Sequence, residues 1–364
     1  GWNRLALDLP SVNGIRVRIT GLRGPPPEDQ GPGALAEVRV PGLRVTERLR
    51  PPVRTERALR GRAAQLRSTA LTYLFERSRG DDPFRRLARP DPDRGLVSGP
   101  IESALVAEPG DPERRIRRTV DIPVARAFRA DGWASVDPDG ADHRLDRWAG
   151  YRGPARFWSS DRYQNVPIRR ASSAFDGSRA TAWVGAGRGS RRPWLAWRSD
   201  RVTTLRRLTL VPAARSAGRV TAVSVQSGGR VTGRLGVGRD GSVALDRPLR
   251  GREFRLRVLA SRPSPGADGA RARTAAVAEL RYPGSPVARI PRTGRVDAAC
   301  GSARVGVDGR VLRTAVRSSV PAMDRGDPLR LVPCGAPVSP GAGPARVDTS
   351  GSLARVDVLR LRSP

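Results

Sequence analysis

The sequence contains no lysine, one histidine and two cysteines among its 364 residues. Without lysine the chain cannot form a Walker-type phosphate loop or a Schiff base, and it has no lysine general base. His143 would have to serve any Ser-His-Asp triad, yet no Gly-x-Ser-x-Gly motif accompanies it, so we expect no catalysis of that kind. The chain also lacks an apolar run of ~18 residues, and we expect neither a membrane span nor a signal peptide in it.

The net charge is +32, and all 67 basic residues are arginine. Abundant Ala, Gly, Pro and Val beside arginine are typical of a GC-rich coding sequence, and acidic residues are scattered between the arginines. We therefore attribute most of the charge to genome composition. The positive field still favours contact with anionic partners, so a binder of nucleic acid or of an acidic lipid surface is one alternative function.

Two stretches of the chain repeat one pattern of strand, loop and strand. Residues 5–42 read LALDLPSVNGIRVRIT and then GALAEVRVPG, separated by a Pro- and Gly-rich loop. Residues 243–284 read VALDRPLRGREFRLRVL and then AAVAELRYPG. Apolar and polar residues alternate in both, which is typical of half-buried strands. The 40 glycines and 33 prolines favour short strands joined by turns, so we predict a mainly β fold built from β-sandwich modules.

The repeat predicts two modules of one type. Residues 1–48 would be the C-terminal part of a truncated first module, and residues 151–285 a complete second one. Because the chain begins with Gly1 and the first copy is cut off, we interpret the chain as a piece of a longer protein. Residues 49–100 read as a helical and irregular connector, in which apolar residues at helical spacing predict a helix over 58–79.

Two short strand-rich segments flank the complete module. Residues 101–150 read as a hairpin or strand pair around Pro123, and residues 286–364 contain four further strand patterns. Neither segment is long enough to bury a sheet face by itself. We therefore predict that they pack together as one split β-sandwich, with residues 151–285 inserted between its halves.

Both cysteines, Cys300 and Cys334, lie in the C-terminal segment, each before a glycine at the end of a predicted strand. Without histidine partners they make a poor zinc site. A disulfide between them would stabilise the fold by ~3–4 kcal/mol in the chain-entropy model. It would also indicate an oxidising, extracytoplasmic compartment. The alternative is a pair of inert buried thiols.

The loop AFDGSRATAW, residues 174–183, is the strongest candidate site. It offers the Asp176 carboxylate and the Thr181 hydroxyl on a turn at Gly177, and Glu279 stands in an otherwise apolar stretch where a charge needs a partner. Hard oxygen donors of this kind suit Ca²⁺. The alternative is that Asp176 caps the turn and Glu279 pairs with an arginine.

A second acidic stretch contains Asp137, Asp139 and Asp142. Its glycine, Gly140, is misplaced for an EF-hand loop, and Trp148 stands where that loop needs a bidentate glutamate. We interpret this stretch as a surface turn rather than a calcium site.

Two short motifs resemble a known domain family. AFDGSRATAW, followed by RPWLAW at residues 192–197, resembles discoidin or coagulation-factor type C domains, which are galactose-binding-like jelly rolls used as carbohydrate-binding modules. In that family the Asp and Thr of this loop and a Glu on the closing strand hold a structural calcium. The resemblance implies that role for Asp176, Thr181 and Glu279.

Four longer motifs are similar to a narrower family, the extracytoplasmic region of the membrane α-(1→3)-arabinofuranosyltransferases of actinobacterial cell walls. They are STALTYLFERSRGDDPFRR at 68–86, DPERRIRRTVDIP at 111–123, LDRWAGYRGPARFWSS at 145–160 and ASSAFDGSRATAWVG at 171–185. In that family the catalytic Asp residues lie in a multi-helix membrane domain, which this chain lacks. No catalytic residue can therefore be assigned here. The implied partner is a membrane catalytic domain of the same full-length protein.

The resemblance implies a non-catalytic region that grips the arabinan of arabinogalactan or lipoarabinomannan, tethered to the outer side of the membrane by parts beyond this chain. Trp158, Tyr163 and Arg192 are our candidates for sugar contact, and we expect Trp183 and Trp194 to pack in the core. A stand-alone adhesion scaffold is a further alternative. A steep salt dependence would favour the nucleic-acid or lipid binder, whereas sugar binding should be nearly independent of salt.

Overall fold

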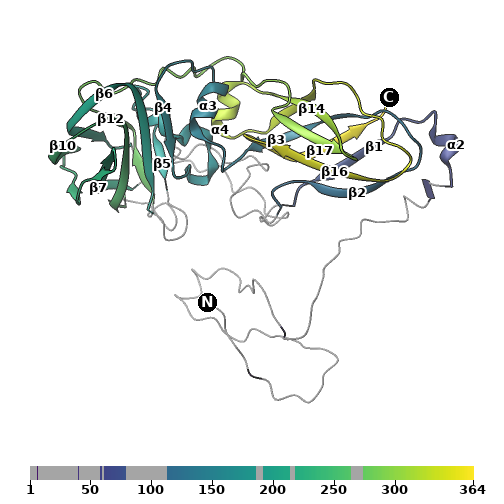
Figure 1. Cartoon of the computed structure of the whole chain (residues 1–364), viewed down its shortest axis with the longest axis horizontal. Coiled ribbons are helices and arrows are strands. Elements are labelled where there is room, and N and C mark those ends of the chain that lie inside the picture. The colour runs from purple at the N-terminus through teal and green to yellow at the C-terminus, as the bar shows by residue number, and fades with distance from the viewer. Residues whose placement is uncertain are drawn as a thin grey trace. The chain divides into compact units, whose positions relative to one another are not determined.

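The computed structural model describes residues 6, 40, 58–59, 61–78, 113–185, 192–213, 218–263 and 274–364. The elements below belong to one compact unit, Arg54–Pro364. The truncated module predicted over residues 1–48 lies outside the described residues. Strands in two sheets dominate the described part of the chain and helices are few, so the predicted mainly β fold is confirmed (Figure 1). None of the helices found there is long and apolar enough to cross a membrane.

The first sheet has eight strands in the order β1-β17-β3-β15-β14-β13-β16-β2, and all its pairs are antiparallel. Its two end strands approach each other. The Tyr73 hydroxyl donates to the Asp121 carbonyl at 3.0 Å, and the Arg118 guanidinium donates to the Glu76 carbonyl at 2.7 Å. The sheet therefore curls back on itself around a core. The strands are β1 (Thr72–Glu76), β2 (Arg117–Ile122), β3 (Arg129–Val136), β13 (Ala303–Val307), β14 (Arg310–Arg317), β15 (Leu329–Pro333), β16 (Gly343–Gly351) and β17 (Ala354–Arg362).

This sheet combines the two segments that flank the inserted module. β2 pairs with β16, and β3 lies between β15 and β17, so the pairing expected between residues 101–150 and 286–364 is observed. The two strands predicted around Pro123 are present as β2 and β3, but they do not form a hairpin, because they do not pair with each other. Both edges of β3 are occupied by C-terminal strands, which leaves β2 to close the far end of the sheet.

The helix predicted over residues 58–79 is also wrong. The structure has a one-turn helix, α2 (Ala63–Leu66), and then the strand β1, which pairs with β17. The sequence TYLFE is rich in β-branched and aromatic residues, which favour a strand wherever a partner edge is available. Leu74, expected on the buried face of a helix, is 66% exposed, while Tyr73 and Phe75 point inward.

The second sheet has nine strands and belongs to the inserted module. Its main path is β12-β6-β10-β7-β11-β5, and β4 adds to β6. β6 and β10 are long, and register shifts at Gly251/Glu253 and Ala244/Leu249 let them bend around the core. The strands are β4 (Arg156–Ser159), β5 (Trp183–Gly185), β6 (Trp194–Val211), β7 (Arg219–Ser227), β8 (Arg230–Val231), β9 (Leu235–Gly236), β10 (Ser242–Arg262), β11 (Ala275–Val277) and β12 (Glu279–Arg281).

A row of aromatic rings fills the core of this module. Phe157, Trp197 and Phe254 are opposite one another on β4, β6 and β10, and each is fully buried. Their rings, with Phe175, form a continuous series with centroid separations of 4.8–5.5 Å. Tyr282 ends the series and accepts a hydrogen bond from the Trp197 indole at 2.7 Å.

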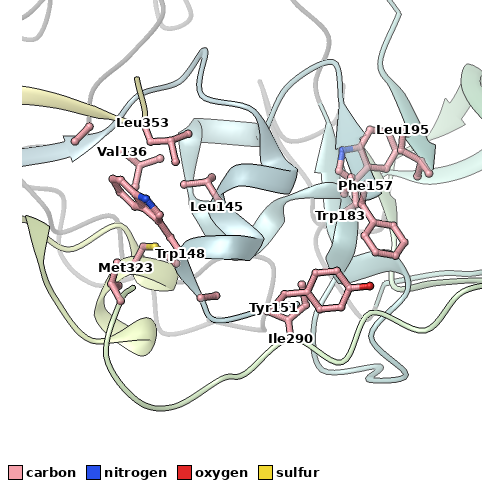
Figure 2. Close-up of a cluster of buried hydrophobic side chains, with 14 of the residues drawn as sticks. Val136, Leu145, Trp148, Tyr151, Phe157, Trp183, Leu195, Ile290, Met323 and Leu353 are labelled. Carbon is pink, nitrogen blue, oxygen red and sulfur yellow. The ribbon is translucent and has the colours of Figure 1, made fainter. Parts of the chain in front are cut away.

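The cores of the two sheets are continuous through helix α3 (Asp142–Trp148). Figure 2 shows Leu145 of α3 between Val136 and Leu353 of the first sheet and the aromatic side chains of the second. α3 thus packs against both sheets.

A buried ion cluster reinforces this connection. The Arg170 side chain has no exposed surface; its Nε lies 2.7 Å from the Asp146 carboxylate on α3, and its Nη1 bonds the Asp324 carboxylate on α4 (Val320–Arg325). Burial raises the pKa of Asp146 to about 6, against the opposing effect of Arg170. One guanidinium therefore bridges two buried carboxylates, one on α3 and one on α4.

The acidic stretch interpreted as a surface turn does form a turn, with Asp139 exposed and Asp137 half-buried, but its third acid is buried. Asp142 is 3% exposed and bonds Arg162 at 2.6 Å. Arg162 also donates to the carbonyls of Asp137 and Gly140, at 2.9 and 2.7 Å. Arg162 belongs to the inserted module, so this turn is partly covered by a residue that lies outside the acidic stretch.

The predicted disulfide is present. Cys300 and Cys334 are bonded, with their Cα atoms 5.7 Å apart. The backbone N–H of Gly301 bonds the Thr314 carbonyl, and that of Cys334 bonds the Arg313 carbonyl. The bridge therefore crosses β14 and connects the chain entering β13 with the chain leaving β15.

Replacing both cysteines by serine should lower the free energy of unfolding by about 3–4 kcal/mol, because the bridge closes a long loop in the unfolded chain. Urea unfolding of the oxidised protein and of the double variant measures the difference. A reducing agent should destabilise the unaltered protein and leave the variant unchanged. Equal stability of the two proteins under oxidising conditions would contradict this role.

Replacing Arg170 by methionine should lower the free energy of unfolding by about 3–5 kcal/mol near neutral pH, because Asp146 would remain buried without its cation and Asp324 would keep only Arg292. The loss should be smaller at about pH 5 than at about pH 8. Burial raises the pKa of Asp146 to about 6, so at pH 5 this carboxyl is mostly protonated in the folded protein and does not need a cation, whereas at pH 8 it is charged. Urea unfolding at both pH values tests this. Arg325→Met, at the exposed end of α4, is the control, and an equal effect of the two substitutions would contradict the prediction.

Candidate functional site

The loop after the short helix η4 (Ala171–Ala174) folds into a tight turn at Gly177, whose φ of +81° favours glycine. Asp176 accepts a hydrogen bond from the Ser178 backbone N–H at 2.9 Å and another from the Thr181 hydroxyl at 2.6 Å. The aspartate and the threonine predicted as calcium ligands are therefore in direct contact.

Glu279, the third predicted ligand, reaches the same loop from β12. It is 3% exposed, and its Oε1 accepts the Gly177 backbone N–H at 2.7 Å. Burial raises the pKa of Glu279, and the neighbouring Asp176 carboxylate adds to that rise. Two acidic side chains thus lie side by side in a site that excludes most water, which is an arrangement that favours a cation.

Two arginines supply positive charge beside these carboxylates. Arg292 bonds the Asp176 carboxylate, and its Nη1 lies 3.0 Å from Asp324. Arg281 lies 3.5 Å from Glu279. Alternating charges therefore connect the loop with the buried Arg170 through Asp324. Over the described residues, no group of three or more His, Cys, Asp or Glu side chains could hold a metal ion.

The three predicted sugar-contact residues lie on different elements. Trp158 is half-buried on β4, and Arg192 is exposed just before β6. Tyr163, in the turn η2 (Tyr163–Asn165), packs against a small apolar cluster of β5 and β11, with the Arg169 guanidinium 5.2 Å from its ring centre. Trp183 is fully buried, as expected.

Trp194 does not pack in the core as expected. The pairing of β4, β6 and β10 places Trp158, Ala196 and Arg255 side by side, and Trp194 shares their face two residues from Ala196. The Arg255 guanidinium lies 4.4 Å above the centre of the Trp194 ring. The neighbouring row of Phe157, Trp197 and Phe254 faces the core, so Trp158 and Trp194 face outward.

We call the surface formed by Trp158, Trp194, Ala196 and Arg255 the outer tryptophan face. Its two tryptophans differ from the aromatic side chains of the module core in being partly exposed to solvent. Both tryptophans are half-buried, and neither belongs to a hydrophobic cluster of the described residues. Ala196 has no exposed surface although it faces outward, so its larger neighbours cover it. The sequence did contain the signal, because residues 194 and 197 are an odd number apart and so lie on opposite faces of a strand.

Apart from the outer tryptophan face, the module has an open hollow of about 540 Å³ where β6 bends. Its lining is mostly polar and comes from β6 and from the chain after β12. It includes Ser199, Asp200, Arg201, Thr203 and Ser285. The hollow offers hydrogen-bonding groups but no aromatic ring, so the outer tryptophan face is the stronger candidate for binding sugars.

Comparisons with known proteins place this architecture beside two groups. No family model matches the sequence, and no curated protein matches it. Among solved structures, arabinofuranosyltransferase AftD from mycobacteria is similar over 69% of this chain, with 18% identity and a TM-score of 0.43; the match covers 20% of that protein.

Two smaller solved domains are similar to part of this chain. A family 32 carbohydrate-binding module of C. perfringens NanJ, in complex with galactose, matches 39% of this chain and 96% of its own length, with 16% identity and a TM-score of 0.28. An F5/8 type C domain from Bacteroides fragilis matches 41% and 94%, with 18% identity and a TM-score of 0.24. These are the two groups that the sequence motifs resemble, and this chain spans about one fifth of the transferase it matches.

Proposed function

We propose that this chain is a non-catalytic glycan-binding region of a cell-wall arabinofuranosyltransferase, and that it grips arabinan of arabinogalactan or lipoarabinomannan. The observation that carries the proposal is the outer tryptophan face. Sugar rings present C–H groups on one side, and these stack on indole rings that remain accessible to solvent. The four long sequence motifs support the choice of transferase.

The spacing of the two rings suits a chain rather than a single sugar. Trp158 lies opposite Ala196, and Trp194 is the diagonal neighbour on the adjacent strand. Side chains in this relation are separated by about 7–8 Å at their backbones, so both indoles can contact one glycan. The half-exposed polar side chains of Ser224 and Gln226, on the same face of β7, are available to hydroxyl groups.

The disulfide supports an extracytoplasmic setting, and the buried junction fixes the orientation of the inserted module. Disulfides persist in oxidising compartments, where the polysaccharides of a cell wall are also found. The continuous core and the Arg170 cluster hold the inserted module against the first sheet. A glycan bound at the outer tryptophan face would then be held in a defined direction relative to the rest of the full-length protein.

We also propose that Asp176, Thr181 and Glu279 hold a structural Ca²⁺. Their oxygens are the hard donors that calcium prefers, and two buried carboxylates in contact are stabilised by a cation. The ion would supply a crosslink between the loop and β12. Arg292 now bonds Asp176, so the ion would compete with this arginine for the carboxylate.

Replacing Trp158 or Trp194 by alanine should weaken binding of soluble arabinan by roughly tenfold each, because each substitution removes one stacking surface. Calorimetric titration at about physiological salt measures the affinity. Val311→Ala, at a 54% exposed position on β14 of the other sheet, is the control and should bind as the unaltered protein does. Unchanged affinity in both tryptophan variants, or no binding of arabinan by the unaltered protein, would overturn the proposal.

Added calcium should raise the melting temperature, and a chelator should lower it, because a ligand that binds only the folded state stabilises it by about 2.7 kcal/mol at a hundredfold excess over its Kd. Glu279→Gln should abolish the calcium response. Asp246→Asn, at an exposed acid on β10, should retain it. A melting temperature that ignores both calcium and chelator would rule out the site.

A further inference from the structure

The outer tryptophan face is framed by arginines. Arg156 and Arg198 lie opposite each other one row from Trp158, and Arg257 is opposite Trp194. With Arg255 they make four arginines, and Glu253 is the only acidic residue that the strand register places among them. The face therefore carries a local excess of positive charge beside its two indole rings.

These arginines differ from those with a structural role. Arg170 and Arg162 are buried and each bonds a carboxylate. Within the described parts of the chain, Arg156, Arg198 and Arg257 form no ion pair, and all three are exposed. Genome composition accounts for the number of arginines in the chain, but not for three unpaired guanidinium groups that surround two half-exposed tryptophans.

We infer that this face binds an anionic glycan, a sugar chain that carries carboxylate or phosphate groups; the inference rests on the proposed glycan-binding function and names its ligand class. The sugar rings stack on Trp158 and Trp194, and the acidic groups bond Arg156, Arg198 and Arg257. Guanidinium groups suit this task because their planar donors match carboxylate and phosphate oxygens in pairs.

A single-stranded nucleic acid could use the same combination of rings and charge. Three features favour a sugar chain. The face is the outer surface of a sheet rather than a charged groove that follows a phosphate backbone. Glu253 lies in the arginine row, where it would repel a continuous line of phosphates. Gln226 and Ser224 border the face with groups suited to hydroxyls.

The test compares native arabinan with the same arabinan after partial carboxymethylation, so the two probes differ in charge. Calorimetric titration at low and at physiological salt should show that the protein binds the carboxymethyl form roughly tenfold more tightly. This preference should decrease as salt is added, whereas binding of native arabinan should hardly change.

Arg156→Gln/Arg198→Gln/Arg257→Gln should lose the preference and keep the affinity for native arabinan. The matched control is Arg304→Gln/Arg313→Gln/Arg330→Gln, which removes the same charge from exposed positions on β13, β14 and β15 of the other sheet. The control should keep the preference. Trp158→Ala/Trp194→Ala should lose binding of both probes.

Four outcomes would overturn the inference. Equal binding of the two probes would reject the anionic ligand while leaving the proposed glycan-binding function intact, whereas no binding of either probe would reject both. An equal loss in the control variant would show that net charge alone attracts the polymer. A thymidine oligonucleotide that binds as tightly as carboxymethyl arabinan, and is lost in the same variants, would identify the face as a nucleic-acid site.

Discussion

The rest of the structure depends on one buried cation between two carboxylates. Arg170 comes from the inserted module, Asp146 from α3 between the sheets, and Asp324 from α4, which connects β14 and β15 of the first sheet. A buried guanidinium without partners is very unfavourable, and so is either carboxylate alone, which means that the three groups stabilise only the assembled junction. The hydrophobic core that runs from Val136 to Phe157 surrounds this cluster and makes its burial possible. The two halves of the first sheet and the module inserted between them therefore support one another.

The same charge pattern continues to the candidate cation loop. Asp324 bonds Arg292 as well as Arg170, and Arg292 reaches Asp176 in the turn that also contacts Glu279. A change of charge at the loop would therefore act on a group that also belongs to the junction. The outer tryptophan face lies on β4, β6 and β10, whose opposite side carries the aromatic core. Its two rings are thus mounted on the most rigidly packed strands of the module, which keeps them in place for stacking without any loop having to close.

Much of the strand pattern could be predicted from the sequence, since alternation of apolar and polar residues in β13 and β15 is visible without any partner strand. β16 was missed, because its glycines and its Asp348 and Thr349 weaken the strand signal, although Ala345 and Val347 alternate inward. β1 was mistaken for part of a helix, because a short run of apolar residues fits both periods when its partner edge is unknown. For the candidate site, the loop motif identified Asp176 and Thr181, but nothing local indicated that Arg292 would reach them.

By itself, the sequence determined the fold class and which residues alternate between core and solvent, because these depend on local spacing and on residue chemistry. It predicted the disulfide as one of two alternatives, and the tertiary structure brings the two cysteines together. Only the tertiary structure decided which strands pair, and therefore that β2 and β3 join strands roughly 200–230 residues later rather than each other. It also decided which arginines pair with carboxylates in the interior and which, over the described residues, form no ion pair beside Trp158 and Trp194. The physical reason is that pairing and neutralisation depend on distances between segments far apart in the chain, and such distances are set when the whole core packs.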